Sequence, residues 1–161
     1  MNILIVYDSL FGNTEIIARQ IAEGFADQKV RLVQAKEASA KDMEALDLLV
    51  TGSPTHAGKP SAHMKDFFSR LPAGALKNIK AAAFDTGIPA AGQKRFLKFM
   101  IKLLGYAAKH IAASLEKSGA VVLAAETFFV LDKEGPLKTG EAERSKQWAT
   151  QLLKQISSAA L

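Results

Sequence analysis

Short apolar runs rich in β-branched residues alternate with longer amphipathic stretches along the chain. Four of the five runs lack a strict two-residue alternation of apolar and polar positions. Continuous apolar runs are typical of strands that are buried on both faces of a parallel sheet. We therefore expect parallel strands over Ile3–Tyr7, Val30–Val33, Leu46–Val50, Ile79–Phe84 and Val121–Leu131.

The stretches between these runs predict helices. Within Thr14–Ala26, the residues Ile17, Ile21 and Phe25 recur at every fourth position, which is the apolar stripe of a surface helix. Ser39 is a favourable N-cap for a second helix. Further helices are expected over Ser61–Leu71, Lys94–Ser118 and Gly140–Ser158.

This alternation predicts one α/β domain over residues 1–161, a doubly wound five-stranded parallel sheet with helices on both faces. Ligands of such sheets bind beyond the carboxyl ends of the strands, near the point where the strand order reverses. The loops after the first, third and fourth strands are therefore the places to look for a functional site.

The composition fits a folded globular domain, because 48% of the 161 residues are apolar and 23% are charged. The chain has no cysteine, which excludes disulfides, thiolate metal sites and cysteine nucleophiles. Its first residues lead into the first apolar run without a basic segment, and no apolar run is long enough to cross a bilayer. We expect a cytoplasmic protein.

The net charge of +5 belongs to one segment of the chain. Residues 94–117 carry six lysines and arginines against Glu116 alone, whereas the other residues carry 15 basic and 15 acidic groups. A general nucleic-acid-binding protein more often spreads its basic groups over a surface. We therefore expect no nucleic-acid partner.

The loop after the first strand has the chemistry of a phosphate site. It offers hydroxyl and amide groups from Ser9, Asn13 and Thr14, and Gly12 allows a sharp turn before a helix N-terminus. Neither the G-x-G-x-x-G fingerprint nor a Gly-Lys-Ser/Thr sequence is present. This favours the phosphate of a mononucleotide over ATP. The alternative is that Ser9 and Thr14 only cap the helix.

The segment Val6–Ala18 resembles the N-terminal signature of the flavodoxin family, with a strand, an aromatic residue, a Ser/Thr-x-x-Gly-x-Thr loop and then a helix. The segments Glu126–Val130 and Gly135–Glu141 are similar to the end of one bacterial subgroup of that family. The resemblance covers essentially the whole chain. It implies a flavodoxin-like fold, flavin mononucleotide (FMN) as cofactor and electron transfer as function.

The resemblance also assigns roles to the three loops. The first loop would wrap the 5′-phosphate of FMN, and the third and fourth loops would border the isoalloxazine ring. The implied cofactor-binding residues are Ser9, Leu10, Phe11, Gly12, Asn13, Thr14, Ser53, Pro54, Thr55, His56, Ala57, Gly58, Lys59, Asp85, Thr86, Gly87 and Gly92.

Two features depart from well-known flavodoxins. Neither ring loop contains a tryptophan or tyrosine, so His56 is the flat side chain nearest the expected ring. The protein is basic, whereas family members are usually strongly acidic. The resemblance assigns to Gly58 a peptide whose carbonyl turns toward the reduced ring. Lys59 is either a charge that stabilises an anionic flavin or simply a solvated loop lysine.

Other chemistry finds little support in the sequence. The three histidines have no metal-ligand spacing, and Ser53 lacks the G-x-S-x-G context of a hydrolase nucleophile. A phospho-receiver domain would need an acidic residue after the third strand, where Thr51-Gly52-Ser53 stands. We expect no metal site and no catalytic side chain.

Residues 94–104 are an apparent basic amphipathic insertion. At 100° per residue, the four basic residues 94, 95, 98 and 102 fall within an arc of about 100°, and apolar residues fill the remaining arc of about 200°. Such a helix could lie on an anionic membrane surface or dock an acidic redox partner. It could also be an ordinary helix packed on the sheet with its lysines in water.

Three functions are therefore compatible with the sequence. The first is an FMN-binding electron-transfer protein, with a cytoplasmic location that could be peripheral to the membrane. The second is an FMN-dependent quinone or protoporphyrinogen-type oxidoreductase at the membrane surface, since relatives of that kind also carry a basic apolar insertion. The third is a binding module that kept the fold without the flavin.

Overall fold

The computed structural model describes residues 1–158, and its five strands form one sheet in which all neighbouring strands are parallel. The strand order is β2-β1-β3-β4-β5, so the order reverses between β1 and β3. The predicted fold class is confirmed, and residues 159–161 of the expected domain lie outside the described residues. The strands are β1 (Asn2–Tyr7), β2 (Lys29–Gln34), β3 (Leu48–Pro54), β4 (Lys80–Gly87) and β5 (Val121–Phe129).

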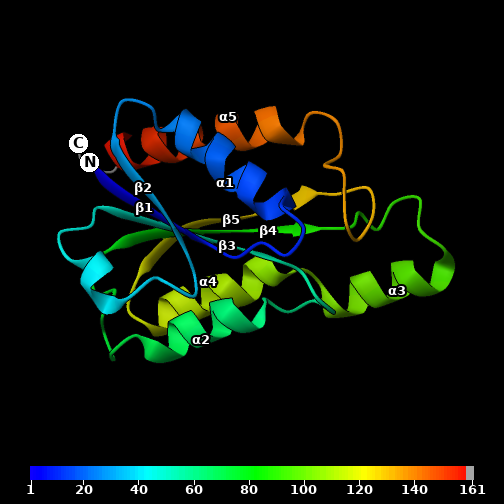
Figure 1. The fold of residues 1–161 in the computed structure, drawn as a ribbon, viewed down its shortest axis with the longest axis horizontal. Coiled ribbons are helices and arrows are strands. Elements are labelled where there is room, and N and C mark those ends of the chain that lie inside the picture. The colour runs from blue at the N-terminus through cyan, green and yellow to red at the C-terminus, as the bar shows by residue number, and fades with distance from the viewer. Residues whose placement is uncertain (159–161) are drawn as a thin grey trace.

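Helices cover both faces of this sheet (Figure 1). Helices α1 (Asn13–Gly24) and α5 (Glu141–Ser158) lie on one face, and α2 (Ala62–Arg70) and α4 (Ala107–Lys117) lie on the other. Alternate side chains of β1 enter two separate cores, because strand residues point to opposite faces in turn. Ile3 and Ile5 join the core that includes α1 and α5, and Leu4 and Val6 join the other.

The long helix expected over Lys94–Ser118 is wrong, because the chain breaks it into α3 (Arg95–Leu104) and α4. Gly105 separates the two helices with a φ of +71°, in the left-handed region that a helix interior does not allow. Helix α4 then starts anew, with the N–H of Ala107 donating to the Asp85 side chain at 3.1 Å.

The helix expected after Ser39 is a single 3₁₀ turn, Ala40–Met43. The N–H and the hydroxyl of Ser39 both donate to Asp42 Oδ2 at 2.9 Å, so Ser39 does stabilise the start of this turn. The turn stops because Ala45 has a φ of +53° and β3 follows from Leu48. The short connection leaves no room for a full helix.

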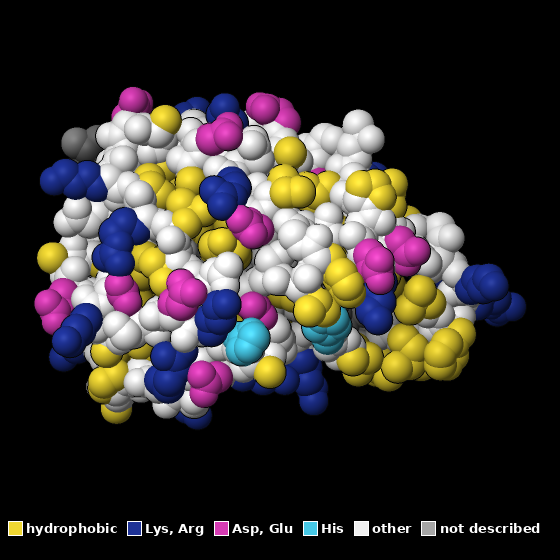
Figure 2. All heavy atoms as spheres, in the orientation of Figure 1, with side chains coloured by type: hydrophobic (Ala, Val, Ile, Leu, Met, Phe, Trp, Pro, Cys, Tyr) yellow, Lys and Arg dark blue, Asp and Glu magenta, His cyan; other side chains and the backbone are white. Residues whose placement is uncertain are grey.

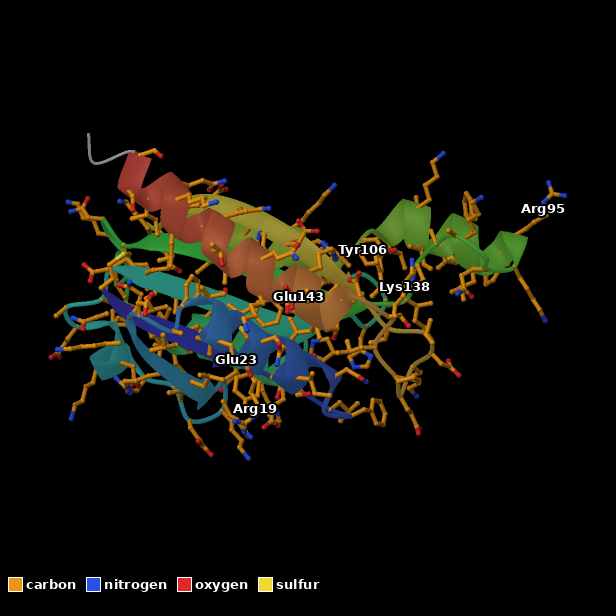
Figure 3. The ribbon with its side chains drawn as sticks, turned by 90° about the horizontal axis from the view of Figure 1, so that it is seen from above. Arg19, Glu23, Arg95, Tyr106, Lys138 and Glu143 are labelled. Atoms are coloured by element: carbon orange, nitrogen blue, oxygen red, sulfur yellow. The ribbon has the colours of Figure 1, made fainter. Side chains whose placement is uncertain are left out.

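Helix α3 stands away from the sheet and from the other helices (Figure 1). None of its residues is buried. Figure 3 shows Arg95 at its outer tip and Tyr106 where the chain returns to the body. Among the described residues, no helix is both long and apolar enough to cross a membrane.

Candidate functional site

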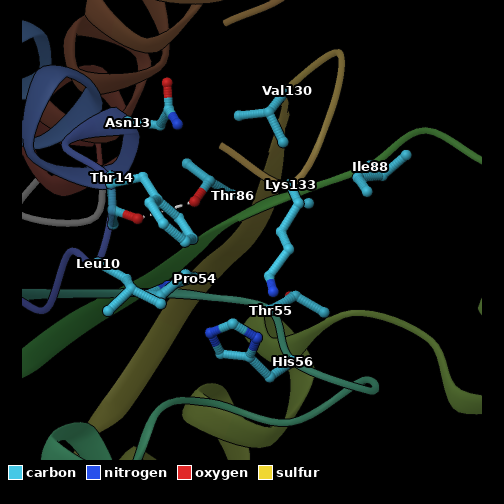
Figure 4. A pocket seen from close by; sticks show the side chains of 12 residues that line it. Leu10, Asn13, Thr14, Pro54, Thr55, His56, Thr86, Ile88, Val130 and Lys133 are labelled. Atoms are coloured by element: carbon cyan, nitrogen blue, oxygen red, sulfur yellow. Dashed lines mark hydrogen bonds between the residues drawn. The ribbon is translucent and has the colours of Figure 1, made fainter. Parts of the chain in front are cut away.

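A cleft, here called the strand-end cleft, opens beyond the carboxyl ends of β1, β3, β4 and β5 (Figure 4). It lies where the strand order reverses, as expected for a ligand site in a sheet of this kind. Its lining residues are Leu10, Phe11, Asn13, Thr14, Pro54, Thr55, His56, Thr86, Gly87, Ile88, Val130 and Lys133.

The first loop ends at Gly12, whose φ of +88° turns the chain into α1. Ser9 Oγ accepts a hydrogen bond from the N–H of Glu15 at 3.3 Å, so Ser9 does cap the first turn of the helix. Thr14 does not cap it, because its hydroxyl bonds with that of Thr86 at 2.8 Å in the buried floor of the cleft. The first N–H groups of a helix have no partner within the helix. They leave a place for a phosphate at the α1 end of the cleft.

The segment after β5, which was not predicted to border the site, closes one side of the cleft. The Asn13 side chain donates to the carbonyl of Glu134 at 3.0 Å and so ties the segment after β5 to the start of α1. This segment brings Val130 and Lys133 into the wall. Figure 4 shows Lys133 extending across the cleft toward Thr55 and His56. Val130 and Lys133 both follow the end of β5, and this position is the one sequence signal that could have identified them.

The third loop forms a tight turn. His56 and Lys59 exchange two backbone hydrogen bonds of 2.9 Å, and the residues between them, Ala57 and Gly58, have positive φ values of +47° and +76°. A Cβ on Gly58 would lie 2.5 Å from the carbonyl oxygen of Leu104, so the end of α3 leaves space only for glycine. The turn presents the exposed His56 ring to the strand-end cleft.

Asp85 lies inside the protein rather than on the wall of the cleft. Its carboxylate accepts hydrogen bonds from Thr55, from Thr127 at 2.7 Å and from the N–H of Ala107. Burial raises the pKa of Asp85 to about 6, although each of these hydrogen bonds favours the ionised form. From its buried position, Asp85 therefore holds the third loop and the start of α4 in place through hydrogen bonds.

Tyr106 is the aromatic residue that the sequence analysis did not place near the ring loops. Its hydroxyl donates to the carbonyl of Ile88 at 3.1 Å, and a Cβ on Gly87 would lie 2.8 Å from its ring. Its ring also packs edge-on against Phe129, with the centroids 5.9 Å apart. Tyr106 thus supports the fourth loop from the α4 side.

The structure brings most of the predicted residues together. Nine of them line the strand-end cleft, and Ala57 and Gly58 line a second, adjoining cleft with Thr55. Six predicted residues line neither cleft: Ser9, Gly12, Ser53, Lys59, Asp85 and Gly92.

Two of these six have clear positions elsewhere. Ser53 is buried, and its hydroxyl accepts the N–H of Ser61 at 2.8 Å. Lys59 is exposed on the other side of the turn, beside Lys65 and His110.

The flavodoxin family model matches residues 5–148. A flavodoxin of Aquifex aeolicus is 41% identical over 69 residues, which cover 41% of this chain and 37% of that protein. A flavodoxin of Haemophilus influenzae is 38% identical over 66 residues, which cover 40% of this chain and 38% of that protein. Each aligned stretch thus spans less than two fifths of the relative's own length.

The solved structure of an archaeal flavodoxin superposes with a TM-score of 0.76 at 17% identity, over 98% of this chain and 99% of that chain. This likeness covers the whole sheet and supports the fold. The family match spans the strand ends that form the cleft, from β1 to the segment after β5. The chain therefore belongs to the flavodoxin family.

Proposed function

We propose that the chain binds FMN in the strand-end cleft and carries electrons to and from a redox partner protein. The observation that supports this most is that Thr14, His56 and Thr86, from the three predicted loops, line one cleft. FMN, when bound, supplies one- and two-electron chemistry. The family match favours a carrier over an FMN-dependent oxidoreductase and over a flavin-free module.

The α1 end of the cleft suits the phosphate of FMN. The positive end of the helix dipole and the N–H groups before Glu15, which have no partner within the helix, attract an anion, and the buried Thr14 hydroxyl lies beside them. Lys133 also lines this cleft, but its side chain extends toward Thr55 and His56 at the ring end and is not part of the phosphate site. A phosphate monoester therefore fits this donor set, although no Walker-type lysine is present.

The ring end of the cleft is formed by the third and fourth loops. His56 offers a flat side chain at the wall, and the Ala57–Gly58 turn offers backbone groups close to it. In this proposal Gly58 would let the peptide at this turn change direction beside a bound flavin, because a glycine adopts positive and negative φ values at similar cost. Lys59 is exposed and outside both clefts, so the solvated position is the simpler interpretation of this residue.

Calorimetric titration of the FMN-free protein with FMN and with riboflavin tests the proposal. We expect one FMN per chain and an affinity for riboflavin that is lower by a factor of about ten or more, because riboflavin lacks the phosphate. Thr14→Val removes a hydroxyl from the phosphate end and should weaken FMN binding while riboflavin binding stays unchanged. The control is Thr150→Val, on the exposed side of α5. Equal affinities for FMN and riboflavin would contradict the phosphate site.

We further propose that α3 places the protein at an anionic membrane surface. The α3 stripe consists of Phe96, Phe99 and Leu103, which are 76%, 60% and 66% exposed. The basic row runs beside it and consists of Lys94, Arg95, Lys98 and Lys102. In Figure 2 a cluster of hydrophobic side chains lies at the same end of the molecule as protruding basic side chains.

The composition of α3 favours lipid over a protein partner. The buried centre of a protein interface is depleted in lysine, whereas bulky apolar residues beside a row of lysines are typical of a helix that lies in a membrane interface. No acidic residue lies in α3 to repel anionic lipid. The helix lies in the membrane plane in this proposal, with the α3 stripe among the acyl chains.

Sedimentation with vesicles tests the membrane proposal. We expect binding to vesicles with roughly 30 mol% phosphatidylglycerol, loss of binding in high salt and no binding to neutral vesicles. Phe99→Asp should weaken binding by a factor of about ten or more, because it puts a charge into the α3 stripe. Val121→Asp, at an exposed apolar position at the start of β5, should not. If anionic vesicles fail to bind while an acidic redox protein does, α3 is a protein-docking surface instead.

A further inference from the structure

A second cleft lies between α3 and the third loop, and it adjoins the strand-end cleft. The cavity volume of this α3 cleft is about 160 Å³. Leu97, Met100, Ile101 and Leu104 of α3 form one wall, and the opposite side includes Gly58 and Tyr106. Small-molecule sites are typically concave and lined mostly by apolar side chains.

The wall of the α3 cleft is a separate row of α3 side chains. At 100° per residue, Leu97, Met100, Ile101 and Leu104 fall on one side of the helix, apart from both the α3 stripe and the basic row. The row that lines the cleft therefore differs from the row proposed to enter the membrane. Substitutions can change one row without changing the other.

The polar side chains that border the α3 cleft already have partners. The Thr55 hydroxyl donates to Asp85 and accepts the N–H of Ala107 at 2.9 Å. The Tyr106 hydroxyl donates to the carbonyl of Ile88. No charged side chain lines the cleft within the described part of the chain. A charged or strongly polar ligand would lose its hydration without gaining hydrogen bonds there, so the cleft favours a neutral, apolar ligand.

The α3 cleft also meets the proposed flavin site. Thr55 and Ile88 line both clefts, and they belong to the two loops that would border the flavin ring. The end of α3 is packed directly on Gly58, with no room for a Cβ between the two. A molecule in the α3 cleft would therefore lie on the outer side of the ring-binding turn.

We propose that the α3 cleft binds a neutral, planar, lipophilic molecule of the size of a substituted naphthoquinone, next to the flavin ring. The placement of this ligand next to the flavin rests on the proposed FMN site. Its neutral, apolar chemistry is inferred from the lining of the α3 cleft alone. The membrane proposal adds a source, because a membrane-bound α3 holds this cleft close to the layer in which such molecules dissolve.

Methyl NMR of the full chain, with methionine methyl groups labelled and menadione as the probe, tests the inference. Of the methionines, Met100 lines the α3 cleft, whereas Met43 and Met64 are buried in the α2–α4 core and serve as internal references. We expect a saturable shift of the Met100 signal alone. The chain has no cysteine, so menadione cannot give a false signal by adding to a thiol.

Two tryptophan substitutions on the same helix separate the cleft from the rest of α3. Leu97→Trp fills the cleft and should weaken menadione binding by a factor of about ten or more. Leu103→Trp changes the α3 stripe, away from the cleft, and should leave menadione binding within about a factor of two of the parent value. Neither residue is buried, so the fold should tolerate both changes.

The titration is made on the FMN-free and on the FMN-loaded protein. Similar shifts of Met100 in both forms support a separate site beside the flavin. Displacement of FMN by menadione, a uniform shift of all methionines or an unsaturable response would overturn the inference. Failure of FMN itself to bind would contradict the proposed function, yet the titration of the FMN-free protein would still decide the α3 cleft.

Discussion

At the scale of single residues, Asp85 connects more of the site than any side chain that lines it. One carboxylate accepts hydrogen bonds from the third loop through Thr55, from β5 through Thr127 and from the first N–H of α4. A buried carboxylate is stable only with such partners. Because burial still outweighs them, the carboxyl takes up a proton near pH 6. Its position is structural, and its protonation affects stability.

The raised pKa predicts that Asp85 makes the folded state less stable as the pH rises. The folded protein holds this proton up to about pH 6, whereas the unfolded chain releases it near pH 3.8. Its stabilising effect is therefore complete below pH 3.8 and is lost as the pH rises through 6. Between pH 4.5 and 7.5, the loss from this one group should be about 2 kcal/mol.

The variant Asp85→Asn isolates this effect in the FMN-free protein. The asparagine oxygen can accept the N–H of Ala107, and its amide can donate to Thr127, but it carries no charge. Its free energy of unfolding relative to the parent should rise by about 2 kcal/mol between pH 4.5 and 7.5, measured by urea denaturation at both values. Asp27→Asn, at an exposed position, is the control. If the difference in free energy of unfolding between Asp85→Asn and the parent is the same at both pH values, the raised pKa of Asp85 is wrong.

At the scale of elements, the apolar runs predicted the sheet because buried parallel strands leave a strong signal in the sequence. They could not predict where the helix pattern breaks. Gly105 lies within a continuous periodic stretch, and a glycine inside such a pattern is often tolerated. The break depends on Asp85, which is 22 residues away in sequence and provides a new helix start at Ala107. A hydrogen bond between residues so far apart in sequence leaves no signal in the local pattern of apolar residues.

The position of the three predicted loops in the fold could also be derived from the sequence. The loops after β1, β3 and β4 were correctly placed at one edge, because the carboxyl ends of parallel strands meet there. Val130 and Lys133 were missed because the segment after β5 is folded back by Asn13, a contact that spans 121 residues. Asp85 was assigned to the cofactor from its place in a loop motif, but the sequence did not indicate that its side chain points inward.

At the scale of the whole molecule, the protein has two parts, one that buries the hydrophobic cores and one, α3, that does not. The sheet and four helices bury the two cores, whereas α3 contributes no buried residue to either. The positive charge is concentrated in the segment that includes α3, and the rest of the chain is electrically balanced. An apolar and basic helix that the fold does not need is costly to expose in water. This cost is the reason for the proposal that α3 contacts an anionic membrane.

Replacement of residues 95–103 by nine glycine and serine residues tests this division in one variant. The melting temperature should change by no more than about 3 °C, because no buried contact is lost. The affinity for FMN should stay within about a factor of three, since residues 95–103 do not line the strand-end cleft. Binding to anionic vesicles should disappear.

A scrambled sequence of residues 95–103 with the same composition is the control for charge alone, because it keeps the lysines and loses the α3 stripe. If the glycine–serine variant unfolds or loses FMN, α3 belongs to the fold. If it still binds vesicles, the membrane contact lies elsewhere on the molecule.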